Sequence, residues 1–307
     1  MNKRFIRGTA IAAVGALALA GCSAAGGEAE APEGGAAEQQ TELTIGVFNG
    51  WPEGEAASFL WEAILEEKGY DVELEYADAG PVFAGVASGD YDVALDGWLP
   101  TTHASYMEEF GDDLVDLGSW NDDAVLTMAV NEDAPITSIE ELAENADAFD
   151  NRIVGIEPGA GLTAATQDEV IPTYGLEDME FITSSTPAML AELQSAIDAG
   201  ENIVVTLWRP HWAYDEFPIR DLEDPEGTLG AAEEIHTIAR TGIEEDFPQV
   251  SEALKNFRMD SELLFSLENA MFNSDAEASD YPEIVTTWMS ENQEYVDGLA
   301  EGIDPVE

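Results

Sequence analysis

The sequence predicts an α/β protein with two similar lobes and a ligand cleft between them. Segments with strand-like and helix-like apolar spacing alternate in the order β-α-β-α-β, and this order occurs twice along the chain. Equivalent positions in the two copies, such as Trp98 and Trp208, lie 110 residues apart. Successive β-α-β units form a mainly parallel sheet flanked by helices, and ligands bind outside the C-terminal ends of its strands. Two such lobes that face each other place both ligand-binding edges in one cleft.

The first copy of the pattern begins at residues 43–48, which read as a strand. The turn 49–54 follows, and from Ala56 to Ile64 apolar residues recur with the period of a helix. Gly69 is placed to end that helix, because glycine readily adopts the left-handed conformation of a C-cap. The other elements expected in this copy are a strand at 72–76, a helix from Gly80 to Gly89 and a strand at 93–95 that leads into Trp98.

The second copy has the same elements in the same order. They are a strand at 152–156, a turn at 158–161, a helix to about residue 173, a strand at 180–183, a helix from Pro187 to Gly200 and a strand at 203–207. Between the copies, residues 124–130 read as a strand that crosses from one lobe to the other, and residues 233–240 read as the return crossing. Ser138 and Glu141 have the spacing of a capping box. A mainly helical part is expected after the return crossing.

The first residues have the pattern of a secretory signal peptide. A positively charged start, with Lys3 and Arg4, precedes an apolar stretch that ends at Cys22 and is too short to span a membrane. A lone cysteine after small residues at the cleavage point is typical of a bacterial lipobox. Cys22 is therefore expected to carry lipid and to anchor the protein at the extracellular face of the cell membrane.

These patterns divide the chain into four parts. We expect a signal peptide at 1–21, a lipid anchor and flexible acidic tether at 22–41, a first lobe at 42–124 plus 236–307, and a second lobe at 125–235. The tether consists almost entirely of Ala, Gly, Glu, Pro and Gln and lacks apolar periodicity, which is typical of a flexible linker.

The chain is strongly acidic, with 65 Asp and Glu residues against ten Lys and Arg and a formal net charge of −55. Such a charge argues against binding to nucleic acid or directly to anionic lipid, since both are polyanions. It fits a life in concentrated salt, where repulsion between like charges is screened. Cys22 is the only cysteine and the three histidines are dispersed, so we expect no disulfide, metal site or cofactor.

A secreted hydrolase on the same α/β framework is the competing class, because a fold does not fix a function. The chain has no G-x-S-x-G nucleophile elbow, no H-E-x-x-H motif and no nucleophilic cysteine. Its carboxylates are spread along the sequence rather than gathered in one motif. We therefore expect a binding protein and not an enzyme.

Three tryptophans, Trp51, Trp98 and Trp208, follow strands and lie in turns that contain glycine or proline. Trp61 and Trp288, in contrast, have the helix spacing of core residues. A quaternary ammonium offers no hydrogen-bond donor and keeps its charge at every pH, so a receptor holds it with the faces of aromatic rings. Each cation–π contact contributes about 0.5 to 2 kcal/mol, and Trp gives the strongest one. Three such rings predict a cage for a methylated cation.

The loop at 158–161 carries two glycines and precedes a helix. Free backbone N–H groups at the positive end of a helix dipole bind anions, and a carboxylate is one such anion. A tight turn without any ligand has the same sequence, so the loop alone does not decide between these readings. It matches neither of the common glycine-rich nucleotide patterns.

Five separated motifs together resemble the glycine betaine substrate-binding proteins of ABC transporters. They are Gly50-Trp51 with its acidic turn, Trp98 to His103, Glu157 to Gly161, Trp208 to Trp212 and Glu233 to Ile238. The resemblance covers essentially everything after the tether and implies a two-lobed periplasmic-binding-protein-like fold of type II. It also implies a monomer without a cofactor, which delivers glycine betaine or proline betaine to a membrane permease and its ATPase subunit.

The resemblance assigns a role to six residues. Three tryptophans of the family surround the ammonium head, and the matching residues here are Trp51, Trp98 and Trp208. Two backbone amides after the Pro-Gly loop and one histidine hold the ligand carboxylate, and the matching residues are Gly161, Leu162 and His103.

The sequence departs from the family pattern in two features. Some members begin with the lobe that carries the Pro-Gly loop, whereas here that lobe comes second. Arg209 stands where a small polar residue is common, and its position next to Trp208 is expected to alter selectivity slightly.

The main rival ligand is choline, which lacks a carboxylate and would favour an acidic partner such as Asp96. Ectoine and amino acids are more distant rivals. His211 is expected to fix its own turn, and His236 to lie on the returning hinge strand.

Overall fold

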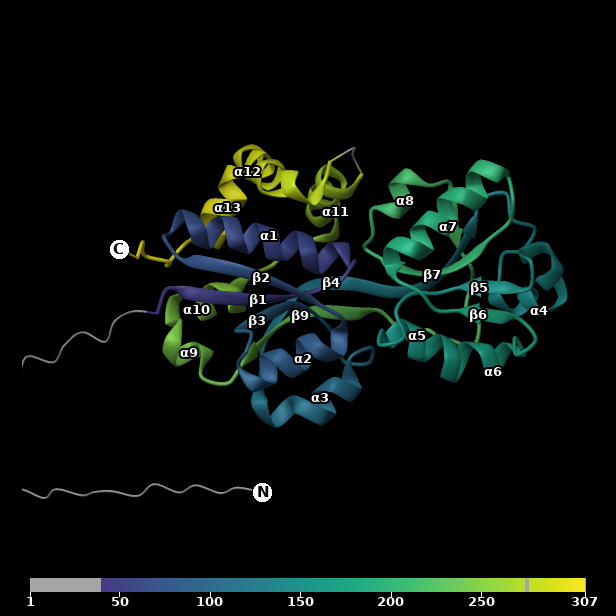
Figure 1. The fold of residues 1–307 in the computed structure, drawn as a ribbon, viewed down its shortest axis with the longest axis horizontal. Helices are drawn as coiled ribbons and strands as arrows, with labels where there is room; N and C mark the ends of the chain where they lie inside the picture. Colours follow the sequence, from purple (N-terminus) through teal and green to yellow (C-terminus); the bar gives the residue numbers. More distant parts are fainter. Residues whose placement is uncertain (1–39, 274–275, 307) are drawn as a thin grey trace, which may run out of the picture. The chain divides into compact units, whose positions relative to one another are not determined.

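The structure, a computed structural model, describes residues 40–273 and 276–306. Within these residues the strands follow one another in the order β2-β1-β3-β9-β4-β7-β5-β6, and β8 pairs with β4 beside this path (Figure 1). The strands are β1 (Glu42–Phe48), β2 (Asp71–Ala77), β3 (Val93–Leu99), β4 (Leu114–Asn131), β5 (Arg152–Val154), β6 (Glu180–Ile182), β7 (Val204–Arg209), β8 (Ile219–Asp221) and β9 (Glu233–Arg240).

Helices cover both faces of the strands. Where β1, β2 and β3 lie, α1 covers one face of the sheet and α2 the opposite face (Figure 1). The C-terminal helices α11 and α12 pack beside α1. The helices are α1 (Pro52–Glu67), α2 (Ala79–Ser88), α3 (Ala104–Phe110), α4 (Leu142–Asn145), α5 (Gly161–Ala165), α6 (Ile171–Tyr174), α7 (Thr186–Ala199), α8 (Ala213–Glu216), α9 (Ile243–Asp246), α10 (Pro248–Asn256), α11 (Ser261–Phe272), α12 (Tyr281–Glu291) and α13 (Gln293–Leu299).

The two copies of the β-α-β-α-β pattern form two parallel groups of strands. β1 pairs in parallel with β2 and β3, and β5 pairs in parallel with β6 and β7. The predicted two-lobed α/β fold is confirmed, as is the mainly helical C-terminal part that α9 to α13 provide. The first copy ends its helices at Gly69 and Gly89 as predicted, both with positive φ.

Two antiparallel strands, β4 and β9, join the parallel groups at the centre of the sheet. β9 has the bounds predicted for the return crossing. β4 is longer than the prediction of 124–130, because it already begins at Leu114. Its first half contains several acidic residues, Gly118 with a φ of 108°, and three irregularities in the pairing with β9. These features interrupt the alternation of apolar and polar side chains from which a strand is read.

Local predictions inside this framework are also confirmed. Ser138 and Glu141 form a capping box, in which the Ser138 N–H donates to the Glu141 carboxylate at 3.1 Å. Trp61 and Trp288 are buried in the apolar core. The signal peptide, Cys22 and all but the last two residues of the tether lie outside the described residues. In the part of the chain that the structure describes, no helix is both long enough and apolar enough to cross a membrane.

Candidate ligand-binding site

All six residues assigned to ligand binding line one small cavity. Its wall consists of Trp51, Glu53, Trp98, Thr102, His103, Leu126, Ile156, Ala160, Gly161, Leu162 and Trp208. The elements that contribute them belong to both parallel groups of strands.

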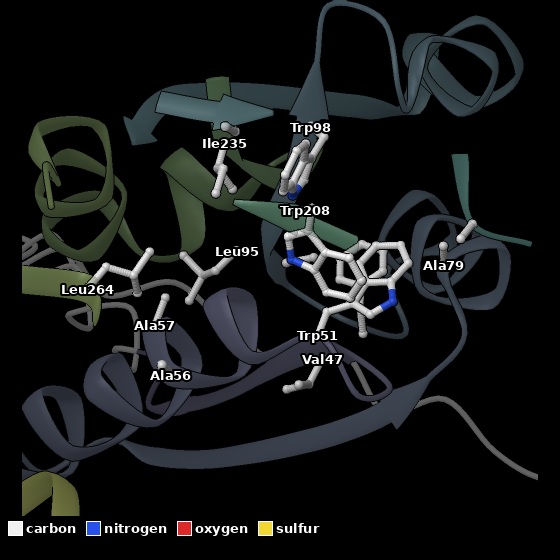
Figure 2. Packing of buried hydrophobic residues seen from close by; sticks show 14 of the residues in the cluster. Val47, Trp51, Ala56, Ala57, Ala79, Leu95, Trp98, Trp208, Ile235 and Leu264 are labelled. Carbon is white, nitrogen blue, oxygen red and sulfur yellow. The ribbon is translucent and has the colours of Figure 1, made fainter. Parts of the chain in front are cut away.

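The three tryptophans reach this cavity from separate elements. Trp51 is the N-cap of α1, whereas Trp98 and Trp208 are the next-to-last residues of β3 and β7. β3 and β7 therefore run beyond their predicted ends at residues 95 and 207, and the rings of Trp98 and Trp208 project from strand ends rather than from turns. The three indoles lie beside one another in Figure 2. The rings of Trp51 and Trp208 are inclined by 64° with centroids 6.4 Å apart, and Phe48 stacks on Trp51 at 5.1 Å.

Acidic side chains hold the indole nitrogens of two cage tryptophans. Trp98 Nε1 donates to Asp96 Oδ1 at 2.9 Å, and Trp51 Nε1 donates to Glu157 Oε2 at 3.4 Å. Glu157 is itself fixed by the backbone N–H and the hydroxyl of Thr186, at 2.8 and 3.1 Å. Because a buried indole N–H needs an acceptor, these acids set the planes of the rings. This supporting role was not expected from the sequence, although the spacing of two residues puts Asp96 and Trp98 on one face of β3.

A cluster of three buried carboxyl groups, Glu53, Asp96 and Glu268, lies beside the tryptophans, and Glu53 itself borders the cavity. Burial raises the pKa of Glu53 to about 7, against the opposing effect of two cage indoles. One of these is Trp208, whose Nε1 makes no hydrogen bond of normal geometry. Burial and the charge of Glu53 raise the pKa of Asp96 and of Glu268. The packing is so close that a Cβ on Gly54 would lie 2.5 Å from the Asp96 carboxyl.

His103 is fully buried and faces the same cavity. Its Nδ1 accepts the backbone N–H of Trp98 at 2.9 Å, and burial lowers the pKa of His103 to about 3. A neutral imidazole that accepts at Nδ1 carries its proton on Nε2. This Nε2 has no hydrogen-bond partner among the described residues. It is therefore a donor that a ligand carboxylate in the cavity would satisfy.

Gly161 and Leu162 contribute the first backbone N–H groups of α5, which no carbonyl within the helix accepts. Gly161 packs directly against the turn that carries His103. A Cβ at this glycine would lie 2.4 Å from the carbonyl oxygen of Thr102, so only glycine permits the approach. The donors assigned to the carboxylate, from two distant parts of the sequence, thus meet in one cavity.

Residues 41–291 match the model of a protein family described as the substrate-binding domain of ABC-type glycine betaine transport systems, OpuAC. The chain belongs to this family. The matched range contains all six assigned residues and both crossing strands.

Individual relatives of the OpuAC family agree with this assignment. A glycine betaine/L-proline-binding protein (ProX) from Borrelia burgdorferi is 30% identical, with a TM-score of 0.78 over 86% of this chain and 100% of that one. Lactococcal OpuAC, solved in a closed conformation with glycine betaine, is 28% identical, with a TM-score of 0.78 over 85% and 100%. The glycine betaine/carnitine transport binding protein GbuC of Listeria monocytogenes is 35% identical over 57% of this chain. That alignment spans only 56% of GbuC itself.

In this OpuAC-family chain, Arg209 does not border the cavity. It follows Trp208 on β7, and successive side chains of a strand point to opposite faces. The Arg209 Nε donates to Asp221 at 2.8 Å, and its guanidinium lies 3.5 Å from the ring centroid of Tyr214. The expectation that Arg209 alters selectivity therefore lacks a contact through which it could act.

The two other histidines have structural partners. His211 Nδ1 accepts the backbone N–H of Ala213 at 3.0 Å, which confirms that this histidine fixes its own turn. His236 lies on β9 as predicted and hydrogen-bonds Asp116 on β4 at 2.9 Å. Although burial alone would lower the pKa of His236, the hydrogen bond and charge of Asp116 raise it. The described residues contain no group of three or more His, Cys, Asp or Glu side chains arranged to hold a metal ion.

Proposed function

We propose that this protein is the substrate-binding protein of an ABC importer and that it carries glycine betaine or proline betaine. The observation that carries this proposal is the convergence of three indoles and a set of carboxylate-binding donors in one small cavity. A betaine has a fixed cation at one end and a carboxylate at the other. The cavity offers a partner for each end.

Trp51, Trp98 and Trp208 would surround the ammonium head. Each cation–π contact contributes about 0.5 to 2 kcal/mol, with the larger values at desolvated sites, and these three rings are buried. The hydrogen bond from Trp98 Nε1 to Asp96 keeps the indole edge turned away from the ligand. Above about pH 7, where Glu53 in the cavity wall is ionised, its charge would add negative potential to the cation end of the site.

The carboxylate of the ligand would accept hydrogen bonds from His103 Nε2 and from the amides of Gly161 and Leu162. All three are neutral donors, so they bind the carboxylate without placing a second buried cation near the ammonium head. Hydrogen bonds to a charged group contribute about 1.5 to 3 kcal/mol each. The donors select a zwitterion over a simple quaternary ammonium.

Ligand binding would close two lobes, formed by residues 42–124 plus 236–307 and by residues 125–235. The pairing of β4 supports this boundary, because the strand pairs with β9 up to Ala124 and with β7 from Val125 onward. Closure would sequester the ligand and present a surface to the permease, which works with an ATPase subunit. We propose no catalytic step for this cavity.

The proposed location is the extracellular face of the cell membrane, with lipid on Cys22 as the anchor. This rests on the signal-peptide pattern before Cys22 and on the acidic tether after it. In cells that carry out lipoprotein processing, the full chain should fractionate with membranes, and Cys22→Ala should release it. Membrane association that persists in Cys22→Ala would rule out this anchor.

Choline is the second candidate ligand, and Glu53 in the cavity wall favours it. An ionised carboxylate there would attract a net cation more strongly than a zwitterion. Isothermal titration calorimetry with glycine betaine, proline betaine, choline, ectoine and proline separates the candidates. We expect both betaines to bind more tightly than choline; the reverse order would reject the betaine proposal.

A further inference from the structure

We propose that Glu233 is a positioning residue for the carboxylate end of the binding site: it holds the turn at 100–103, so that His103 and Gly161 face the same ligand group. The inference rests on the proposed function, because it concerns how a betaine carboxylate is held. It gives a role to the Glu233 to Ile238 motif, which no ligand contact explains.

Glu233 is buried and accepts three hydrogen bonds from the turn that follows β3. One oxygen, Oε2, accepts the backbone N–H groups of Thr101 and Thr102 at 2.7 and 2.9 Å. The other oxygen, Oε1, accepts the Thr102 hydroxyl at 2.5 Å. A buried carboxylate is stable only when its oxygens are satisfied. The turn and the carboxylate therefore fix each other.

The turn that Glu233 holds is part of the cavity. Thr102 lines it, and the carbonyl oxygen of this residue touches Gly161, as the 2.4 Å approach of a Cβ there shows. His103 follows directly, and its backbone N–H donates to the Trp98 carbonyl at 3.0 Å. A shift of Thr102 would therefore move His103 and the amide of Gly161 relative to each other. The Trp98 ring has its own support in Asp96 and would be affected less.

Glu233 also links the turn at 100–103 to the strands that cross between the two parallel groups. Glu233 is the first residue of β9, and it lies opposite Ala124, where β4 changes its pairing partner. The carboxylate thus connects the crossing strands to the turn beside His103. The neighbouring Glu234 is exposed and lies 3.4 Å from His236 instead. This pair of adjacent acids offers a matched comparison.

The test compares one ligand that has a carboxylate with one that lacks it. Glycine betaine and choline are titrated into wild type, Glu233→Ala, Glu233→Gln and Glu234→Ala, with thermal unfolding as the control for folding. In Glu233→Ala the affinity for glycine betaine should fall at least about tenfold, the equivalent of one hydrogen bond to a charged group. Choline affinity should change less than about twofold, because the cage keeps its own supports.

Glu233→Gln should retain most of the affinity for glycine betaine. Its amide oxygen would still accept the two backbone N–H groups, and its NH₂ would donate to the Thr102 hydroxyl. Glu234→Ala should behave as wild type. If Glu233→Ala does not fold, Thr102→Val, which removes a single hydrogen bond, should still weaken glycine betaine alone.

The positioning role is overturned if glycine betaine affinity is unchanged in Glu233→Ala, or if both ligands weaken by the same factor. The second result would mean that Glu233 supports the whole fold rather than one end of the site. Failure of the proposed function is seen separately, because wild type would then not bind glycine betaine.

Discussion

Asp96 and Trp98 are hydrogen-bond partners on one face of β3, with Oδ1 of Asp96 accepting the indole N–H of Trp98 at 2.9 Å. The backbone N–H of the same tryptophan donates to His103 Nδ1 at 2.9 Å. Trp98 is therefore held at both its ring and its backbone. Through these two bonds it connects the cage that would receive a cation to the histidine that would receive a carboxylate.

Replacing Trp98 by alanine should weaken binding of glycine betaine. Loss of one desolvated cation–π contact costs about 1 to 2 kcal/mol, which is roughly a five- to thirtyfold fall in affinity. Calorimetric titration measures this directly. Trp212→Ala is the control, because Trp212 is not part of the cavity wall. Equal affinity of wild type and Trp98→Ala would remove Trp98 from the site.

Raising the pH should destabilise the folded protein through Glu53. The pKa of Glu53 is raised by burial from its usual 4.5 to about 7, so the folded state keeps a proton that the unfolded state releases. This contribution is fully present below about pH 4.5 and is lost as the pH rises through about 7. Between about pH 5 and pH 8 it amounts to about 2 to 3 kcal/mol.

The experiment for Glu53 is urea unfolding of wild type and Glu53→Gln at both ends of that pH range. Glutamine resembles the protonated acid, so the loss of stability with pH should be smaller in the variant. Glu67→Gln, at an exposed position of the same helix, should keep the wild-type pH dependence. The prediction fails if wild type and Glu53→Gln lose the same free energy of unfolding.

Replacing Arg209 by serine should lower stability and leave ligand affinity unchanged. The variant loses the partly exposed ion pair to Asp221 and the stacking on Tyr214, together about 1 kcal/mol after screening by solvent. Denaturant unfolding and calorimetry measure the two quantities on the same sample. A change in the preference between glycine betaine and choline would show that Arg209 acts on the site after all.

Salt should stabilise the protein strongly, because 65 acidic residues repel one another at low ionic strength. The thermal unfolding midpoint should rise between about 0.1 M and about 1 M sodium chloride as the Debye length falls from about 10 to 3 Å. Potassium chloride serves as the matched salt and should act alike. A midpoint that does not move with salt would contradict the role assigned to the acidic surface.

Much of the fold and most of the assigned cavity residues were accessible from the sequence. Strand and helix periodicities are local, and so are the glycines that end α1 and α2, which is why the repeated β-α-β-α-β order is confirmed. Trp51, Trp98 and Trp208 were singled out because a large aromatic residue near a strand end and beside glycine or proline is unusual, and the structure places all three at one cavity. The first half of β4 was missed because its bulges and acidic residues break the local alternation.

The sequence by itself determined the order of the elements and the identity of six of the residues that line the cavity. Only the tertiary structure decided which acids support them. Glu268 joins Glu53 and Asp96 from a distant helix, and Glu233 reaches Thr102 across 131 positions of the sequence. Local sequence places Asp96 beside Trp98 and Glu233 in a motif, but it does not show which groups any of these four carboxyl groups contacts. The raised pKa of Glu53 results from burial, and the contact of Glu233 with its turn results from burial and hydrogen bonding. Both effects depend on which groups surround a carboxyl group in space, and this is decided only when the chain has folded.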